Sequence, residues 1–139
     1  MGTTDAMRAA VNRARDHWNK GDLDGYLELY DPQIALHGYA PAPMSKTEVR
    51  GFYAGFFEAF PGAQLHFDEL VGEGDTLMMR FHCELTHRGP FMGAPPTGRS
   101  ARLDGHTSMH FRDGKVVARW STADFLGLMV QLGLMPPPG

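Results

Sequence analysis

Three side chains combine acid–base chemistry with positions where a pocket is expected: His37, His87 and Asp124. Histidine gains and loses a proton near neutral pH, so His37 and His87 are candidate general acids or bases. Asp124 directly precedes Phe125 and can cap a helix that begins there. Alternatively, Asp124 is a half-buried carboxylate whose pKa rises until it accepts a proton near pH 7. These three residues are our candidate catalytic residues.

Three further histidines, His82, His106 and His110, form no recognisable metal-binding motif. Zinc or non-haem iron needs three ligands that converge, and the sequence has neither an HExxH motif nor a pair of cysteines. Strand alternation places these histidines on the polar outer face of a sheet. There they are either exposed or part of a sheet-to-sheet contact between two subunits. We therefore predict no metal site.

The strand and loop that position His87 have the clearest sequence pattern. From Leu77 to His87, apolar residues alternate with polar ones, which is typical of a strand with one buried face. Such a face requires a covering layer of helices. Glycines and prolines from Gly89 to Gly98 then prevent the strand from continuing. His87 therefore lies where an apolar surface meets a loop, and small-molecule pockets often carry their polar groups in such a place.

The rest of the chain divides by its helical and strand periodicities. The predicted helices run from Thr3 or Thr4 to Lys20, over Leu23–Leu29, from Ser45 (in a capping box with Glu48) to Phe60, and over Phe125–Leu132. The other predicted strands are Ile34–His37, Gln64–Val71, Ala101–Phe111 and Lys115–Thr122. This order predicts an α+β fold, in which a curved and mostly antiparallel sheet wraps a helical layer.

The Asp113-Gly114 pair predicts a tight hairpin, which sets the register of the last two strands. Without a β-bulge, Phe111 pairs with Val116, Met109 with Ala118, and Thr107 with Trp120. All of these side chains would then face the helices, and Arg119 and Ser121 would face outward. A bulge would reverse these directions beyond the point where it occurs.

The third predicted helix carries an aromatic face that includes Phe52 and Phe56. Such a face usually packs in the core, but some of its rings can also line a cavity for a flat apolar ligand. Trp18 in the first helix, Phe81 in the central strand, and Trp120 are predicted to share that cavity. The predicted partner is therefore a small hydrophobic molecule.

Composition restricts the classes of function. The chain has 139 residues, a net charge of −3 and one cysteine. This size fits a single domain spanning residues 1–139. No run of basic residues suggests nucleic acid or a membrane surface as a partner, and no apolar run is long enough to cross a membrane. An N-terminus without an apolar core is not a signal peptide, and one unpaired cysteine suits a reducing compartment, so we expect a cytoplasmic protein.

Several motifs resemble those of one family, the SnoaL-like polyketide cyclases and the related predicted ester cyclases. The similarity covers nearly the whole chain, and the spacing between the Pro-Pro-Thr-Gly run and Asp-Gly-Lys matches without a gap. The residues that carry it are Thr86–Arg99, Gly105, Asp113–Val117, Trp120, Asp124 and Gln131–Gly133, together with Trp18-Asn19, Pro32 and His37.

The resemblance implies the nuclear transport factor 2-like (cystatin-like) fold, an α+β cone with a deep apolar pocket. It also implies a homodimer or higher homo-oligomer and a reaction without a cofactor. The best-known members close a polyketide ring by an intramolecular aldol reaction, in which an aspartate removes a proton and a histidine assists. Those two positions hold Ser121 and Thr107 in this chain, and we add both to the predicted substrate-binding residues.

Three functions follow as hypotheses. The first is a cofactor-independent cyclase, or a related lyase or isomerase, that acts by acid–base chemistry on a hydrophobic, polyketide-like carbonyl compound. The second is a protein that binds a small hydrophobic molecule without changing it, which the replacement of the cyclase aspartate and histidine motivates. The third is a hydroxylase or an ester or epoxide hydrolase, because one fold can carry many chemistries.

Overall fold

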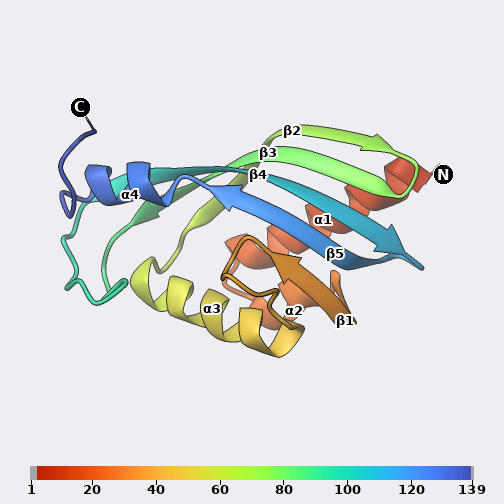
Figure 1. The fold of residues 1–139 in the computed structure, drawn as a ribbon, viewed down its shortest axis with the longest axis horizontal. Coiled ribbons are helices and arrows are strands. Elements are labelled where there is room, and N and C mark those ends of the chain that lie inside the picture. Colours follow the sequence, from red (N-terminus) through yellow and green to blue (C-terminus); the bar gives the residue numbers. More distant parts are fainter. Residues whose placement is uncertain (1–2, 139) are drawn as a thin grey trace.

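The computed structural model describes residues 3–138, and its sheet is covered by helices on one face (Figure 1). The domain prediction also included Met1, Gly2 and Gly139, which lie outside the described residues. The elements are α1 (Thr3–Asn19), α2 (Leu23–Leu27), β1 (Tyr30–His37), α3 (Lys46–Ala59), β2 (Gln64–Glu73), β3 (Thr76–Thr86), β4 (Ser100–Arg112), β5 (Lys115–Ala123) and α4 (Phe125–Gln131).

The strands form one sheet in the order β1-β5-β4-β3-β2. The β1–β5 pair is parallel and the other three pairs are antiparallel. Helices α1, α2 and α3 lie against the concave face of this curved sheet, and α4 follows β5 at one end (Figure 1). The predicted α+β class is therefore confirmed. No helix within residues 3–138 has the length and apolar character that a membrane crossing needs.

The helices form where the sequence supplies an apolar stripe and a cap. Buried Met7, Val11, Ala14 and Trp18 line one side of α1. The predicted capping box of α3 is present, because Ser45 accepts a hydrogen bond from the Glu48 amide and Glu48 accepts one from the Ser45 amide. Helix α1 begins at Thr3, so Thr3 and Thr4 lie within the helix and neither is its N-cap.

Strand β1 is longer than predicted and includes Asp31 and Pro32. Because β1 is an edge strand, the missing amide hydrogen of Pro32 disturbs no central ladder. The strand begins at Tyr30, whose partner in β5 is Val116, and its register shifts before Ala35. The preceding helix α2 accordingly ends at Leu27 instead of Leu29.

The register of β4 and β5 corrects the prediction made without a bulge. Phe111 pairs with Val116 as predicted, but Met109 pairs with Arg119 and Thr107 pairs with Ser121. A bulge between these pairs places Val117 as an extra residue in β5 and reverses every later side chain. As a result, Arg119 and Ser121 face the helices.

The predicted inward orientation of Trp120 is therefore wrong. Its side chain lies on the outer face of the sheet and is 44% exposed. The Trp120 ring stacks on the ring of His37, its partner in β1, at 4.7 Å between centroids and an interplanar angle of 5°.

Candidate functional site

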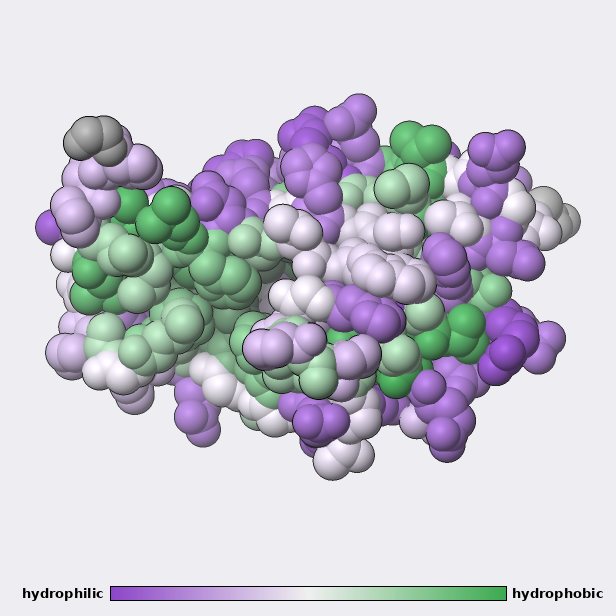
Figure 2. All heavy atoms as spheres, in the orientation of Figure 1, coloured by the Kyte–Doolittle hydropathy of each residue, from purple (hydrophilic) through white to green (hydrophobic). Residues whose placement is uncertain are grey.

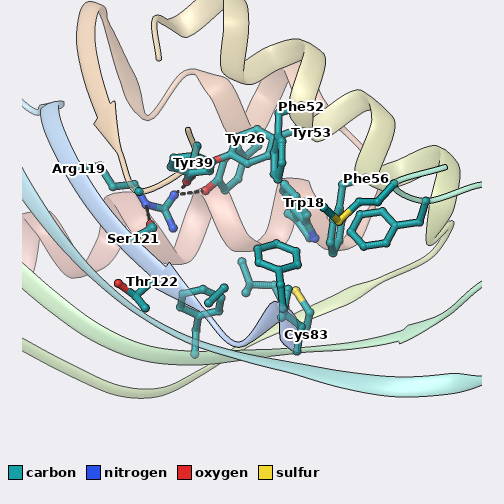
Figure 3. Close-up of a pocket in the computed structure, with 18 residues that line it drawn as sticks. Trp18, Tyr26, Tyr39, Phe52, Tyr53, Phe56, Cys83, Arg119, Ser121 and Thr122 are labelled. Atoms are coloured by element: carbon teal, nitrogen blue, oxygen red, sulfur yellow. Dashed lines mark hydrogen bonds between the residues drawn. The ribbon is translucent and has the colours of Figure 1, made fainter. Parts of the chain in front are cut away.

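A cavity of about 450 Å³ lies between the helices and the inner face of the sheet. Its mouth is visible as an apolar hollow between α3 and α4 (Figure 2). Most of the lining side chains are aromatic or aliphatic, and polar groups gather at one end (Figure 3). The lining residues are Trp18, Tyr26, Gly38, Tyr39, Phe52, Tyr53, Phe56, Leu65, Phe81, Cys83, Phe91, Met92, Leu103, Arg119, Ser121, Thr122, Ala123 and Phe125.

The apolar wall is built from both layers of the fold. Trp18 from α1 packs against Phe57 of α3, with 4.4 Å between ring centroids. On the sheet side, Phe81 lies over Gly105 of β4, where an added Cβ would come within 2.4 Å of the Phe81 ring. The buried indole Nε1 of Trp18 has no hydrogen-bond partner within residues 3–138. The wall is therefore apolar apart from this one buried N–H group, which has almost no accessible surface.

Arg119 forms the polar end of the cavity and is only 6% exposed. Its Nε donates hydrogen bonds of 2.9 Å to both Thr107 Oγ1 and Ser121 Oγ. Its Nη1 donates to the hydroxyl groups of Tyr26, at 2.9 Å, and Tyr30. Nη2 makes no hydrogen bond to any described residue. The guanidinium is thus fixed on two sides and keeps one nitrogen for a ligand.

All four tyrosines of the chain surround Arg119. Their hydroxyl groups form a chain of contacts from Tyr26 to Tyr30 at 3.2 Å, from Tyr30 to Tyr53 at 2.7 Å, and from Tyr53 to Tyr39 at 2.7 Å. Burial raises the pKa of Tyr30 and Tyr53 well above the usual value, and this effect outweighs the opposing charge of Arg119. Both hydroxyl groups therefore keep their hydrogens at neutral pH.

The hydroxyl chain has one more hydrogen than it uses. Arginine only donates hydrogen bonds, so a tyrosine hydrogen in this cluster finds an acceptor only in another hydroxyl. Three contacts join the four hydroxyl groups and use three of their four hydrogens. Tyr26, Tyr39 and Tyr53 line the cavity. The polar end therefore presents donors from both Arg119 and the tyrosines, and a ligand oxygen is the matching acceptor.

Within residues 3–138, Arg119 is the only charged residue whose side chain lines the cavity. The ion pairs of the described residues all involve other basic groups, so no carboxylate neutralises Arg119. Burial raises the pKa of the Cys83 thiol to about 12, so this thiol is protonated at neutral pH. In the described part of the chain, the lining thus contains a cation and neutral hydrogen-bond donors, with no carboxylate or imidazole base.

Asp124 lies outside the cavity and caps α4. One carboxylate oxygen accepts a 2.8 Å hydrogen bond from the Gly127 amide, and the side chain is exposed. An added Cβ at Gly127 would meet this carboxylate at 2.2 Å, so the glycine makes room for the cap. This geometry fits the capping interpretation of Asp124 and gives its carboxylate no contact with the cavity.

His87 is fully buried beneath the loop at 88–99 and does not line the cavity. Its Nδ1 accepts a 3.1 Å hydrogen bond from the amide of Thr97, which ties that loop to the end of β3. Its Nε2 has no partner within residues 3–138, and the ring lies 5.5 Å from that of Phe60. The position of His87 suits a structural anchor for the loop.

The other predicted site residues divide between the two faces of the sheet. Trp18, Phe52, Phe56, Phe81 and Ser121 line the cavity, and Thr107 lies directly behind Ser121 at 2.8 Å between the two hydroxyl oxygens. His37 and Trp120 are stacked together and do not line the cavity. The structure therefore does not bring His37, His87 and Asp124 together in the cavity.

The sequence analysis did not identify Arg119 or the tyrosines as functional residues. Arg119 was not identified because a regular hairpin would turn it toward solvent, whereas the bulge at Val117 turns it inward. Tyr26 and Tyr30 lie four residues apart, but one is in α2 and the other begins β1. No short-range pattern indicated that both hydroxyl groups would meet Arg119.

A family model for SnoaL-like polyketide cyclases matches residues 8–132. A search of curated protein sequences gives no match. Among solved structures, AclR from Streptomyces galilaeus, a proposed hydroxylase, is 30% identical with a TM-score of 0.87, and the match covers 94% of this chain and 97% of AclR.

Two other solved structures are also similar over nearly their full length. IdmH from Streptomyces antibioticus, a proposed polyketide cyclase, is 27% identical with a TM-score of 0.80, over 91% of this chain and 98% of IdmH. TsrD from Streptomyces laurentii is 26% identical with a TM-score of 0.79, over 92% of this chain and 98% of TsrD.

Proposed function

The chain belongs to the SnoaL-like polyketide cyclase family, and on this basis we propose that it binds a hydrophobic, carbonyl-bearing, polyketide-like molecule and promotes its enolisation. The enolate then closes a ring in an aldol-type reaction or is reprotonated as an isomer. Arg119 and the tyrosine hydroxyl groups stabilise the negative oxygen. As the resemblance implies, the proposed reaction needs no cofactor.

The observation that carries this proposal is a buried guanidinium without a carboxylate partner at the end of an apolar cavity. A buried charge is costly unless it is paired, so a ligand with a negative or strongly polarised oxygen would compensate Arg119. An enolate forms its charge only after binding, and preorganised donors that stabilise developing charge lower the barrier. The spare tyrosine hydrogen provides a second donor to the same oxygen.

Thr107 and Ser121 distinguish this site from that of an aldol cyclase with an aspartate base. Both hydroxyl oxygens accept hydrogen bonds from Arg119 Nε and fix the guanidinium where the resemblance places acid–base groups. We therefore assign the protein an electrophilic role, and the α-proton passes to water. In ring closure, the enolate carbon forms a bond to a second carbonyl carbon, and the resulting alkoxide takes a proton from a tyrosine that water reprotonates.

The test uses benzoylacetone, an aromatic 1,3-diketone whose enolate absorbs at longer wavelength than its enol. Binding to the wild-type protein should lower the apparent pKa of this probe by about 1 unit or more, which corresponds to about 1.4 kcal/mol of preferential enolate binding. Exchange of its α-hydrogens in D₂O, followed by NMR, should become faster in the presence of the protein. The pKa shift measures recognition of the anionic oxygen, and the exchange rate measures catalysis.

Arg119→Met is the informative variant for this test. Methionine keeps an unbranched side chain without the charge, and the substitution removes the cost of burying an unpaired guanidinium. We expect the variant to fold and to bind neutral 2-acetylnaphthalene about as well as the wild type. The lowered pKa of bound benzoylacetone (the enolate shift) and the faster exchange of its α-hydrogens should both be lost. An unchanged enolate shift in Arg119→Met would contradict the proposal.

None of the described residues that line the cavity carries a carboxylate or an imidazole, which favours a second candidate, a binding protein without turnover. In that case the enolate shift is present, but hydrogen exchange is no faster than in buffer. The similarity to AclR supports a third candidate, hydroxylation. Product formation that depends on added reductant and oxygen would distinguish hydroxylation from the other two.

A further inference from the structure

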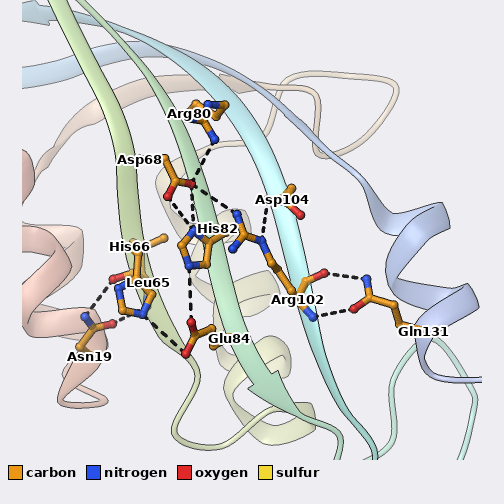
Figure 4. Close-up of polar contacts among 10 residues, drawn as sticks. All are labelled: Asn19, Leu65, His66, Asp68, Arg80, His82, Glu84, Arg102, Asp104 and Gln131. Atoms are coloured by element: carbon orange, nitrogen blue, oxygen red, sulfur yellow. Dashed lines mark hydrogen bonds and ion pairs between the residues drawn. The ribbon is translucent and has the colours of Figure 1, made fainter.

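Three potential metal ligands converge on the outer face of the sheet, away from the cavity. His66 of β2 lies directly opposite His82 of β3, and Glu84 follows on the same face of β3. Glu84 oxygens lie 3.6 Å from His82 Nε2 and 3.9 Å from His66 Nε2 (Figure 4). One ligand atom from each residue lies within 4.8 Å of the others. We call these three residues the His–His–Glu cluster.

The two imidazole rings in this cluster are stacked. They stack with 4.8 Å between centroids and an interplanar angle of 17°. Both Nε2 atoms lie near the Glu84 carboxylate, but the lone pair of each imidazole lies in its ring plane, so one of the stacked rings must turn before both can bind one ion. His82 is 8% exposed and is held by its surroundings, whereas the side chain of His66 is 47% exposed and has room to rotate. A small rotation of His66 would therefore bring its Nε2 closer to the other two ligand atoms.

Asp68 provides an independent observation that points to a ligand. Its two carboxylate oxygens lie 2.8 and 3.0 Å from His82 Nδ1. Because an ionised carboxylate only accepts hydrogen bonds, Nδ1 carries the hydrogen. The lone pair of a neutral His82 is then on Nε2, which faces the cluster. Metal-binding histidines generally donate their other ring N–H to a carboxylate, a backbone carbonyl or water, and that partner fixes the tautomer and the orientation of the ring.

The charges around the cluster also favour a cation. Arg80 is paired with Asp68 and Glu69, and Arg102 is paired with Asp68 and Asp104. With Glu84 included, four carboxylates face two guanidinium groups. When both histidines are neutral, this region is net negative. A divalent cation would reduce that imbalance.

We propose that His66, His82 and Glu84 bind one zinc ion, with Asp68 as the positioning residue for His82. Two histidines and one carboxylate are the protein ligands of zinc sites that keep a fourth position for water. Tetrahedral zinc at about 2.0–2.1 Å from each ligand requires ligand atoms about 3.3 Å apart. The distances from Glu84 to the two imidazoles, 3.6 and 3.9 Å, are close to that spacing, and rotation of His66 would bring its Nε2 nearer to that of His82. The ion would join β2 to β3 as a cross-strand clip.

No metal site was predicted from the sequence because His82 was grouped with His106 and His110 as possible ligands. The register separates these three, since His106 pairs with Arg80 and His110 pairs with Thr76. His66 and Glu84, which do meet His82, were not in that set. The proposed zinc site is independent of the proposed function, because Phe81 and Cys83 face the cavity while His82 and Glu84 face outward.

The test is calorimetric titration of the tag-free full chain with zinc chloride. We expect one zinc ion per chain, and a melting temperature that rises with zinc and returns when the metal is chelated. Glu84→Gln and His66→Gln should each weaken zinc binding about tenfold or more, by loss of a ligand. The matched control is His106→Gln, an exposed histidine on the same face, which should bind zinc like the wild type.

Cobalt spectroscopy and Asp68→Asn test the geometry. Cobalt(II) in place of zinc should give the intense visible bands of a four-coordinate site, and Glu84→Gln should abolish them. Asp68→Asn should weaken zinc binding by about tenfold while keeping the cobalt spectrum, because it removes a positioning group and no ligand. Three results would overturn the proposal. They are no zinc binding by the wild type, wild-type zinc affinity in both Glu84→Gln and His66→Gln, and a loss of affinity in His106→Gln as large as in those two variants.

Discussion

At the scale of single residues, Arg119 is the group on which the proposed chemistry depends. Its Nε is held by Thr107 and Ser121 and its Nη1 by tyrosine hydroxyl groups, which leaves Nη2 for a ligand. Side chains that are positioned before the ligand arrives need no reorganisation during the reaction. Hydroxyl groups accept its hydrogen bonds but no carboxylate within residues 3–138 balances its charge, so a ligand with a negative oxygen would supply that compensation.

A first prediction concerns Asp124, whose two interpretations lead to different results. If Asp124 only caps α4, Asp124→Asn should change the free energy of unfolding little, because asparagine is an equally good N-cap. Asp124→Ala should lower that free energy by about 1 kcal/mol through loss of the cap. Urea denaturation measures both values. Neither variant should change the hydrogen-exchange rate of benzoylacetone, and a lost rate in Asp124→Asn would assign catalysis to the carboxylate.

A second prediction follows from the raised pKa of Tyr30 and Tyr53. In the unfolded chain these tyrosines lose their protons near pH 10, whereas burial keeps them protonated in the folded protein. Above about pH 10 the unfolded state therefore binds fewer protons, and the free energy of unfolding falls as the pH rises. Below that pH this contribution does not vary with pH.

Ultraviolet absorbance of tyrosinate measures this effect directly, because all four tyrosines of the chain belong to the cluster. At least two of the four should remain protonated at pH 11 until the protein unfolds. Tyr53→Phe is the control and should reduce the slope of stability against pH. Ionisation of all four tyrosines in the folded protein would contradict the prediction.

At the scale of elements, the bulge in β5 determines which chemistry faces the cavity. One extra residue, Val117, turns Arg119 and Ser121 inward and Trp120 outward. At the polar end of the cavity, the backbone at Gly38 passes close to the backbone of Ser121. Gly38 has a positive φ of 93°, and an added Cβ there would come within 1.9 Å of the Ser121 carbonyl oxygen. The loop after β1 can therefore pass directly beside β5 at the cavity.

A third prediction tests the contact between β3 and β4. A methyl group at Gly105 would overlap the Phe81 ring, so Gly105→Ala should lower the free energy of unfolding by about 1–3 kcal/mol through overpacking. Combining Gly105→Ala with Phe81→Leu should recover much of that loss, because the smaller side chain makes room. The coupling in this double-mutant cycle is measured by urea denaturation. Additive losses would show that the overlap is relieved elsewhere.

At the scale of the whole molecule, the sheet separates two chemically different faces. The inner face carries the cavity and Arg119, and the outer face carries the His–His–Glu cluster and exposed apolar side chains. Val71, Met78 and Trp120 on that outer face are 65%, 57% and 44% exposed. Large exposed apolar side chains that gather in one region are typical of contacts between proteins.

A fourth prediction is that the protein is a homodimer joined through the outer face of the sheet. Light scattering after size-exclusion chromatography should then give twice the 15.4 kDa of one chain. Met78→Glu should shift the mass toward the monomer by placing a charge in the contact. Leu126→Glu in α4, where the leucine is 50% exposed, is the control and should not change the mass. A monomeric wild-type protein would contradict the prediction.

Sequence periodicity predicted the α+β class and most of the elements, because each depends on local spacing. The alternation of β3, the stripe of α1 and the capping box of Ser45 and Glu48 are all short-range patterns. The same local signals placed Phe52, Phe56 and Phe81 on faces that line the cavity. Local spacing did not predict that β1 includes Pro32, because proline is tolerated there only through the edge position of the strand.

Local sequence patterns were enough to predict the two layers of the fold and most of the apolar wall of the cavity, and spaced motifs indicated the family. The tertiary structure decided the polar chemistry. A single bulge reverses strand parity, so the inward positions of Arg119 and Ser121 depended on one residue of register. The four tyrosines come from α2, β1, α3 and the segment between β1 and α3, and the zinc ligands come from two strands. Hydrogen bonds and metal coordination require atoms that lie a few ångströms apart in space. Residues far apart in the sequence reach such distances only when their segments pack together, and sequence spacing does not predict that packing.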